Sequence, residues 1–183
     1  MNYYYLIASL PMLRIDAPPP FTTTEFQSLC RDYLTPEDFE ALEAILNSKI
    51  EDSTHPFVQE WRNRDTQIRN AVVRQRASNL KQDPTPHLRE QEGFSAHVDK
   101  LAGDAFSKGS PLDREQALDA LRWDSIDELA GLDPFTGRAV LAYTLKLLLA
   151  QRWAQMNEDK GKQLGNDIVN RDSNRNEEET NDE

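Results

Sequence analysis

The feature that most constrains the fold is a long helical pattern that begins near Pro56. Its apolar side chains recur at the spacing of one helix face; they are Phe57, Trp61, Ile68 and Val72. The segment of residues 83–86 carries two prolines, and proline both lacks a backbone donor and clashes with the preceding helical turn. We therefore expect one long helix from about Pro56 to Leu80.

Two shorter helices have clear start signals upstream. Thr22 and Glu25 form a capping box, in which each side chain satisfies a free backbone N–H of the other residue. The helix that follows should reach about Tyr33. Thr35, followed by Pro36, is a typical N-cap for a second helix. The side chains expected inside are Phe26, Leu29 and Cys30 from the first helix, and Phe39, Leu42, Ile45 and Leu46 from the second.

Three further helices are expected downstream, over residues 94–106, from Ser110 onward, and over residues 133–157. The inward side chains of the first two are Val98, Leu101 and Ala105, then Leu118, Leu121, Leu129 and Leu132. The third is apolar nearly all round, which is typical of a helix central to the fold or half-covered by a partner. We expect a central position.

These patterns predict an all-α protein, a helical bundle of about six helices over residues 1–170. It forms a single domain, or two lobes that meet near residues 82–93. The apolar run of residues 3–9 is too short for periodicity to separate strand from helix, so both remain open. Residues 171–183 are acidic and lack an apolar anchor, which predicts a disordered tail.

Charge excludes one class of function and suggests another. The net charge of −11 argues against a nucleic-acid binder, which needs a basic surface. Residues 55–89 nevertheless carry 7 basic and 3 acidic side chains. This stretch is either a solvated helix face or a docking surface for an acidic partner. The candidate partner-binding residues are Arg62, Arg74, Arg76 and Trp123. Arg74 is the best single candidate because it points away from the apolar stripe, and Trp123 lies off the leucine stripe of its own helix.

The sequence contains no recognisable catalytic or cofactor motif. We therefore expect a non-enzymatic protein without metal or cofactor. Asp65 interrupts the apolar stripe, and Arg69 at i+4 can pair with it, so we interpret the two as a structural ion pair. A small hydrolase using Asp65 is the catalytic alternative. The acidic cluster of Asp124, Asp127 and Glu128 is either a divalent-ion site or a solvated helix face.

Three segments resemble a bacterial family whose genes lie in operons for V-type (archaeal-type) ATP synthases. They are the opening of residues 3–11, the middle Ser-Pro-Leu-x3-Gln-Ala-Leu-x2-Leu-Arg-Trp of residues 110–123, and the later stretch of residues 135–153. That family resembles a shortened form of the central-stalk adapter of V/A-type ATPases, which is the d subunit in eukaryotic V-ATPases. The repeated aromatic–Asp–Asn–Arg motif of that adapter is echoed by Trp61, Asp65 and Arg74, with Ile68 in the Asn position.

The resemblance implies an all-helical, non-catalytic component that seats the central stalk of the rotor on the membrane proteolipid ring. Such a component is cytoplasmic, and it associates with the membrane through its complex. No signal peptide is visible, and the longest apolar stretch, residues 139–150, is too short to insert into a bilayer. The partners would be central-stalk and membrane-ring subunits of a V-type ATPase. A cytosolic assembly or regulatory adaptor is the alternative.

Overall fold

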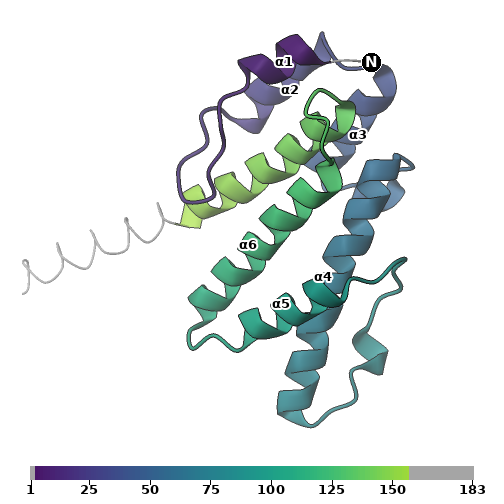
Figure 1. The fold of residues 1–183 in the computed structure, drawn as a ribbon, viewed down its shortest axis with the longest axis vertical. Helices are drawn as coiled ribbons and strands as arrows, with labels where there is room; N and C mark the ends of the chain where they lie inside the picture. Colours follow the sequence, from purple (N-terminus) through teal and green to yellow (C-terminus); the bar gives the residue numbers. More distant parts are fainter. Residues whose placement is uncertain (1–2, 157–183) are drawn as a thin grey trace, which may run out of the picture.

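The computed structural model describes residues 3–156, and every regular element in this range is helical (Figure 1). The expected all-α helical bundle is confirmed. The helices are α1 (Tyr4–Ser9), α2 (Thr23–Arg31), α3 (Pro36–Leu46), α4 (Pro56–Leu80), α5 (Ala96–Phe106) and α6 (Pro111–Ala130). A further helix covers residues 137–156 and is called helix 137–156 below. Two single-turn 3₁₀ helices, η1 (Ile50–Asp52) and η2 (Thr85–His87), flank α4. The expected tail, residues 171–183, lies outside the described residues.

The helix starts follow the capping signals of the sequence. The Glu25 amide donates to Oγ1 of Thr22 at 3.2 Å, and the Thr22 amide donates to Oε2 of Glu25 at 2.8 Å, so the capping box is confirmed. At the start of α3 the Asp38 amide donates to Oγ1 of Thr35, and at the start of α6 the Asp113 amide donates to Oγ of Ser110. The long helix α4 begins and ends where the prolines predicted, and the left-handed Lys81 closes it.

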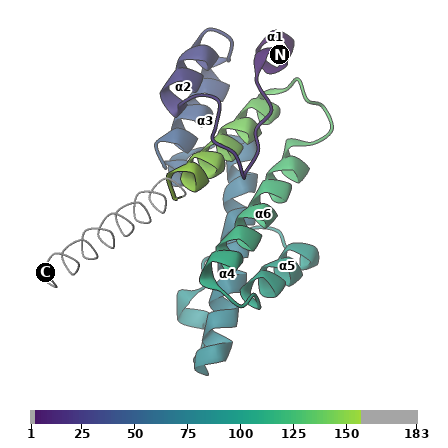
Figure 2. The same cartoon turned by 90° about the vertical axis from the view of Figure 1, so that its left-hand side faces the viewer.

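The buried apolar side chains form two clusters at opposite ends of the molecule. The first, which we call the terminal core, takes residues from both ends of the described chain; examples are Phe26, Phe57 and Leu141. The second, the middle core, joins α4, α5 and α6; examples are Ile68 and Val98. Among the described helices, only α4 and α6 contribute to both cores. Figures 1 and 2 show α4 extending further toward the lower end of the molecule than α6.

The division between the cores crosses α4 and α6 rather than following residues 82–93. On α4 it falls between Trp61 and Ile68, and on α6 between Leu121 and Ile126. Residues 82–93 instead return along the lower half of α4 (Figure 1). Any two lobes of this chain therefore share two continuous helices.

Helix 137–156 is central, as its all-round apolar pattern predicts. Val140, Leu141 and Leu147 are fully buried, although they lie on different sides of the helix. They pack in the terminal core against α1, α2, α3 and the first turns of α4. Trp61 on the apolar stripe of α4 and Trp153 on helix 137–156 are both buried.

The structure identifies one element that the sequence left open and corrects two expected burials. The run of residues 3–9 is the helix α1. Leu29 is 38% exposed because it lies on the outer edge of α2, so its expected burial is wrong. Leu132 is also exposed, because Gly131 at φ 82° ends α6 before it. None of the helices described between residues 3 and 156 is both long enough and apolar enough to span a bilayer.

Candidate functional site: the ion-pair network between the two cores

A buried carboxylate lies between α6 and helix 137–156, close to where the two cores divide. Asp119 has no exposed surface. Its Oδ1 accepts from Nη1 of Arg122 at 2.6 Å, and its Oδ2 accepts from Nη1 of Arg152 and Nε1 of Trp153, both at 2.9 Å. A buried charge is tolerated only when it is paired and hydrogen-bonded, and three donors meet that condition here.

Arg122 extends this network to α4. Its Nε donates to Oδ1 of Asp65 at 2.9 Å, while Oδ2 of Asp65 accepts from Nε of Arg69 at 2.7 Å. The side chains of Asp65 and Arg122 are 14% and 16% exposed, whereas Arg69 is 59% exposed. On the other side, Arg152 reaches Glu115 at 2.9 Å on the surface of α6. Cations and anions therefore alternate along a chain of six side chains, with equal numbers of each.

The electrostatics favour a permanently charged Arg122. Burial by itself would lower its pKa, but the negative charges and hydrogen bonds of Asp65 and Asp119 outweigh that effect, so the pKa is raised above its usual value. Because both carboxylate oxygens of Asp65 accept from guanidinium groups, its carboxylate is already engaged. The network is thus suited to fixing α4, α6 and helix 137–156 against one another.

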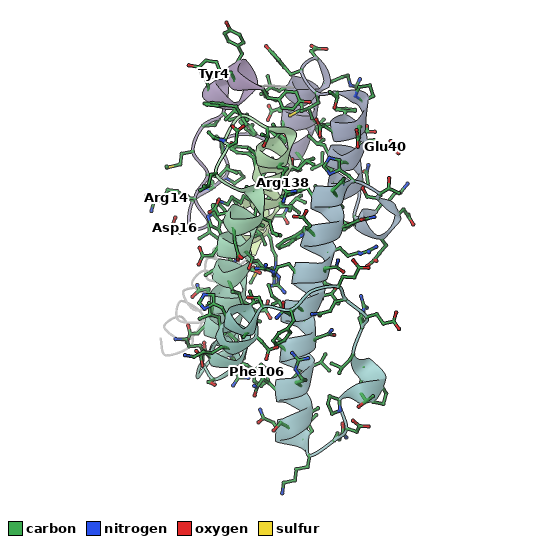
Figure 3. The ribbon with its side chains drawn as sticks, turned by 45° about the vertical axis from the view of Figure 1, so that its right-hand side comes forward. Tyr4, Arg14, Asp16, Glu40, Phe106 and Arg138 are labelled. Atoms are coloured by element: carbon green, nitrogen blue, oxygen red, sulfur yellow. The ribbon has the colours of Figure 1, made fainter. Side chains whose placement is uncertain are left out.

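A second group of hydrogen bonds, made by Arg138, joins the same three helices within the terminal core region. Arg138 donates to both carboxylate oxygens of Glu60 on α4, at 3.1 and 2.5 Å, and to the carbonyl of Leu129 at the end of α6. Figure 3 shows Arg138 between helix 137–156 and α4. The hydrogen bond from Arg138 lowers the pKa of Glu60 despite the opposing effect of burial.

Sequence reasoning identified the pair of Asp65 and Arg69 but missed the more buried partner. The i, i+4 spacing within α4 reveals Arg69. Arg122 is 57 residues away from Asp65, and only its spacing to Asp119, three residues earlier, gave any local signal. The buried pair of Gln67 and Asn70 was also missed. Gln67 exchanges two hydrogen bonds with the backbone of Ser95, and Asn70 exchanges two with that of Arg89.

The candidate docking arginines lie in different surroundings. Arg74 pairs with Asp99 on α5, so a contact within the chain already accounts for its position. Arg62 lies 3.8 Å from Glu51, a weak surface pair. Arg76 is exposed and has no ion-pair partner among residues 3–156. Their binding to a partner stays a prediction, and Arg76 is the freest of the three.

Trp123 and the acidic cluster of α6 also contact other elements. Nζ of Lys146 lies 4.7 Å from the centre of the Trp123 ring, and the same ammonium pairs with Asp127. Glu128 accepts from Nη1 of Arg64 at 2.8 Å. Two of the three acids proposed as a divalent-ion site are therefore paired with cations, which favours the interpretation as a helix face.

Comparison with known proteins adds one partial match. Residues 96–174, less than half of the chain, match the model of a family described as a protein of unknown function (DUF2764). The match begins with α5 and includes α6, helix 137–156 and the network residues Asp119, Arg122 and Arg152. No curated protein and no solved structure matches the chain.

Proposed function

We propose that this protein is a non-catalytic connector in a bacterial V-type ATPase, joining the central rotor stalk to the membrane proteolipid ring so that ion transport is coupled to ATP. The basis is the resemblance of residues 3–11, 110–123 and 135–153 to the family encoded in V-type ATPase operons. The protein would act in the cytoplasm and reach the membrane only through its complex.

The observation that supports a mechanical role is that ion pairs join α4 and α6, the two helices shared by both cores. Both cores are built on α4 and α6, and the ion pairs of Asp65, Arg122 and Asp119 fasten these helices at the division between the cores. A connector that transmits torque needs a stiff body and complementary surfaces, and it needs no cofactor. An acidic surface on the partner would meet the basic segment of residues 55–89.

The test is co-purification of the tagged full-length chain with V-type ATPase subunits from its native membranes. The expected result is stoichiometric recovery of stalk and ring subunits. Arg76→Glu should then weaken association with the purified complex, most strongly at low salt, while Lys100→Glu, the same reversal of charge at an exposed site on α5, should not. Recovery without any V-type ATPase subunit, from membranes shown to contain the complex, would reject the proposal.

An assembly or regulatory adaptor is the second candidate, and the half-buried Trp123 beside an open pocket favours it. An adaptor would bind an assembly intermediate and be absent from the finished complex. Quantifying the chain in intact and partly assembled complexes separates the two: a fixed ratio in the intact complex indicates a connector, and enrichment in intermediates an adaptor.

A further inference from the structure

A pocket of about 510 Å³ opens between the chain that follows α1, the outer face of α6 and helix 137–156. Its lining is mainly apolar and includes Leu10, Met12, Trp123, Ala139 and Tyr143. The volume lies within the range typical of ligand pockets and is enough for a few bulky side chains. Met12 at its rim is 90% exposed.

The walls of this pocket are fixed by specific contacts. The hydroxyl of Tyr143 donates to the carbonyl of Pro11 at 2.8 Å, which ties the chain after α1 to helix 137–156. Lys146 is held over the Trp123 ring and is neutralised by Asp127. Lys146, the one cation among the described lining residues, is therefore already paired. The indole of Trp123 beside it is half-buried in the pocket.

The charge around the pocket is negative. Asp124, next to Trp123, is exposed on α6 and has no ion-pair partner among residues 3–156, whereas Asp127, one turn further along, is already paired with Lys146. The segments that build the terminal core and the pocket, residues 3–61 and 123–156, carry 6 basic and 14 acidic side chains. A ligand that carries positive charge beside its apolar groups would be attracted to this face.

We infer that this pocket binds an amphipathic segment of a partner protein, whose bulky apolar side chains enter beside Trp123 and whose lysines or arginines face Asp124 on α6. Helices that present apolar side chains at i, i+3 and i+4 commonly dock in such grooves, with an aromatic residue as the main anchor. The inference concerns a different face from the basic segment of residues 55–89, and it holds whether or not the partner is a V-type ATPase subunit.

The test uses a displayed library of random 16-residue peptides, selected on the full chain after removal of peptides that bind the Trp123→Ala variant. Enriched peptides should combine Leu, Ile, Phe or Trp with Lys or Arg. The dissociation constant of the most enriched synthetic peptide is then measured by calorimetry. Trp123→Ala should weaken binding at least tenfold, and Met12→Arg severalfold. Leu132→Arg, the same change at a fully exposed site outside the pocket, should alter it less than twofold.

Because Met12 is 90% exposed, Met12→Arg keeps the test valid even if Trp123→Ala proves unstable. The inference is overturned if no peptide is enriched, if the enriched peptides are acidic, or if Met12→Arg and Leu132→Arg bind the peptide equally well. A peptide whose apolar residues are replaced by alanine should lose binding; if it does not, the attraction is only electrostatic and the inference fails. None of these outcomes bears on co-purification with a V-type ATPase, so the two proposals fail independently.

Discussion

The two cores differ in both size and composition. The terminal core comprises 16 buried residues, among them Tyr3, Phe26, Phe57 and Trp61. The middle core comprises 8, of which three are alanines and none is aromatic. Since hydrophobic stabilisation grows with the apolar area removed from water, the terminal core contributes the larger share of it. The middle core requires additional interactions to hold α4, α5 and the returning chain together.

Polar contacts supply those interactions. Gln67 and Asn70, both buried on α4, hold the returning chain at Ser95 and Arg89 through paired hydrogen bonds. The ion pair of Arg74 and Asp99 joins α4 to α5. Buried polar groups stabilise a structure only in one geometry, because misplacement leaves them unsatisfied. The comparison therefore indicates a terminal core stabilised by packing and a middle region that depends more on specific polar pairing.

The largest loss of stability is expected from disrupting the ion-pair network between the two cores. Asp119→Ala removes a fully buried carboxylate and leaves Arg122, Arg152 and the indole N–H of Trp153 without their shared partner. The loss of unfolding free energy should be about 3–5 kcal/mol, the range for breaking a buried ion pair. Urea denaturation followed by circular dichroism measures it.

Glu115→Ala is the matched control, because Glu115 binds the same Arg152 but is 40% exposed. Its cost should stay below about 1 kcal/mol, as for a surface pair. Equal losses for the two variants would contradict the central role given to Asp119. Two separate transitions in the Asp119→Ala variant would show that the network couples the cores.

Much of the fold could be predicted from local signals. The caps at Thr22, Thr35 and Ser110 and the prolines at both ends of α4 act within one helical turn, so they place helix ends without knowledge of the tertiary fold. Leu132 shows the limit of periodicity. The apolar spacing continued past Gly131, but the left-handed backbone of that glycine stopped the helix.

The candidate sites were less predictable because they depend on contacts between distant segments. The partner of Asp65 on α6 and the pocket beside Trp123 both require the packing of α6, which sequence spacing does not reveal. Arg74 illustrates the same problem. Its position off the apolar stripe favoured solvent exposure, yet that side of α4 faces α5 and Asp99. Helical periodicity identifies one buried face, whereas α4 has more than one neighbour.

Alkaline pH should destabilise the terminal core through its buried titratable groups and leave the middle core unaffected by them. Burial raises the pKa of the Cys30 thiol to about 12, and residues 62–124 contain neither cysteine nor tyrosine. Above pH 9 the unfolded thiol ionises while the folded one stays protonated, so the folded state binds more protons and stability falls as pH rises. The slope from Cys30 should approach about 1.4 kcal/mol per pH unit between pH 9 and 12. Urea denaturation at several pH values measures it.

Cys30→Ala should flatten this slope, even if the small cavity lowers stability at neutral pH. Burial, with a smaller effect from Cys30, also raises the pKa of Tyr143 to about 12, so a shallower decline should persist above pH 10 in the variant. A slope between pH 9 and 10 that is unchanged by Cys30→Ala would show that the thiol reaches solvent in the folded protein.

In the terminal region, the carboxyl group of Asp38 lies very close to Gly137. Asp38 on α3 accepts from the hydroxyl of Tyr3 at 2.5 Å and from that of Thr35 at 2.9 Å, and it lies 3.3 Å from Nε2 of His55. Its carboxyl group lies against Gly137, the first residue of helix 137–156. A Cβ added at Gly137 would come within 2.7 Å of Cγ of Asp38. These hydrogen bonds restrict the carboxyl group, so it cannot move aside freely.

Gly137→Ala should therefore cost about 1–3 kcal/mol, the range for overpacking, even though alanine is intrinsically the better helix former. Gly109→Ala, in the turn between α5 and α6, is the control: its Cβ would meet nothing within 4 Å, so stability should stay the same or rise by about 0.4–1 kcal/mol. Thermal and urea denaturation of both variants measure the difference. If the clash with Asp38 is the cause, the losses from Gly137→Ala and Asp38→Ala should not add in the double variant, because the shortened side chain leaves room for the new methyl group. Full additivity would mean that the loss has a cause other than the clash with Asp38. A stabilising Gly137→Ala would mean that α3 and helix 137–156 can separate at little cost, and that the terminal region is less tightly packed than the comparison of the two cores indicates.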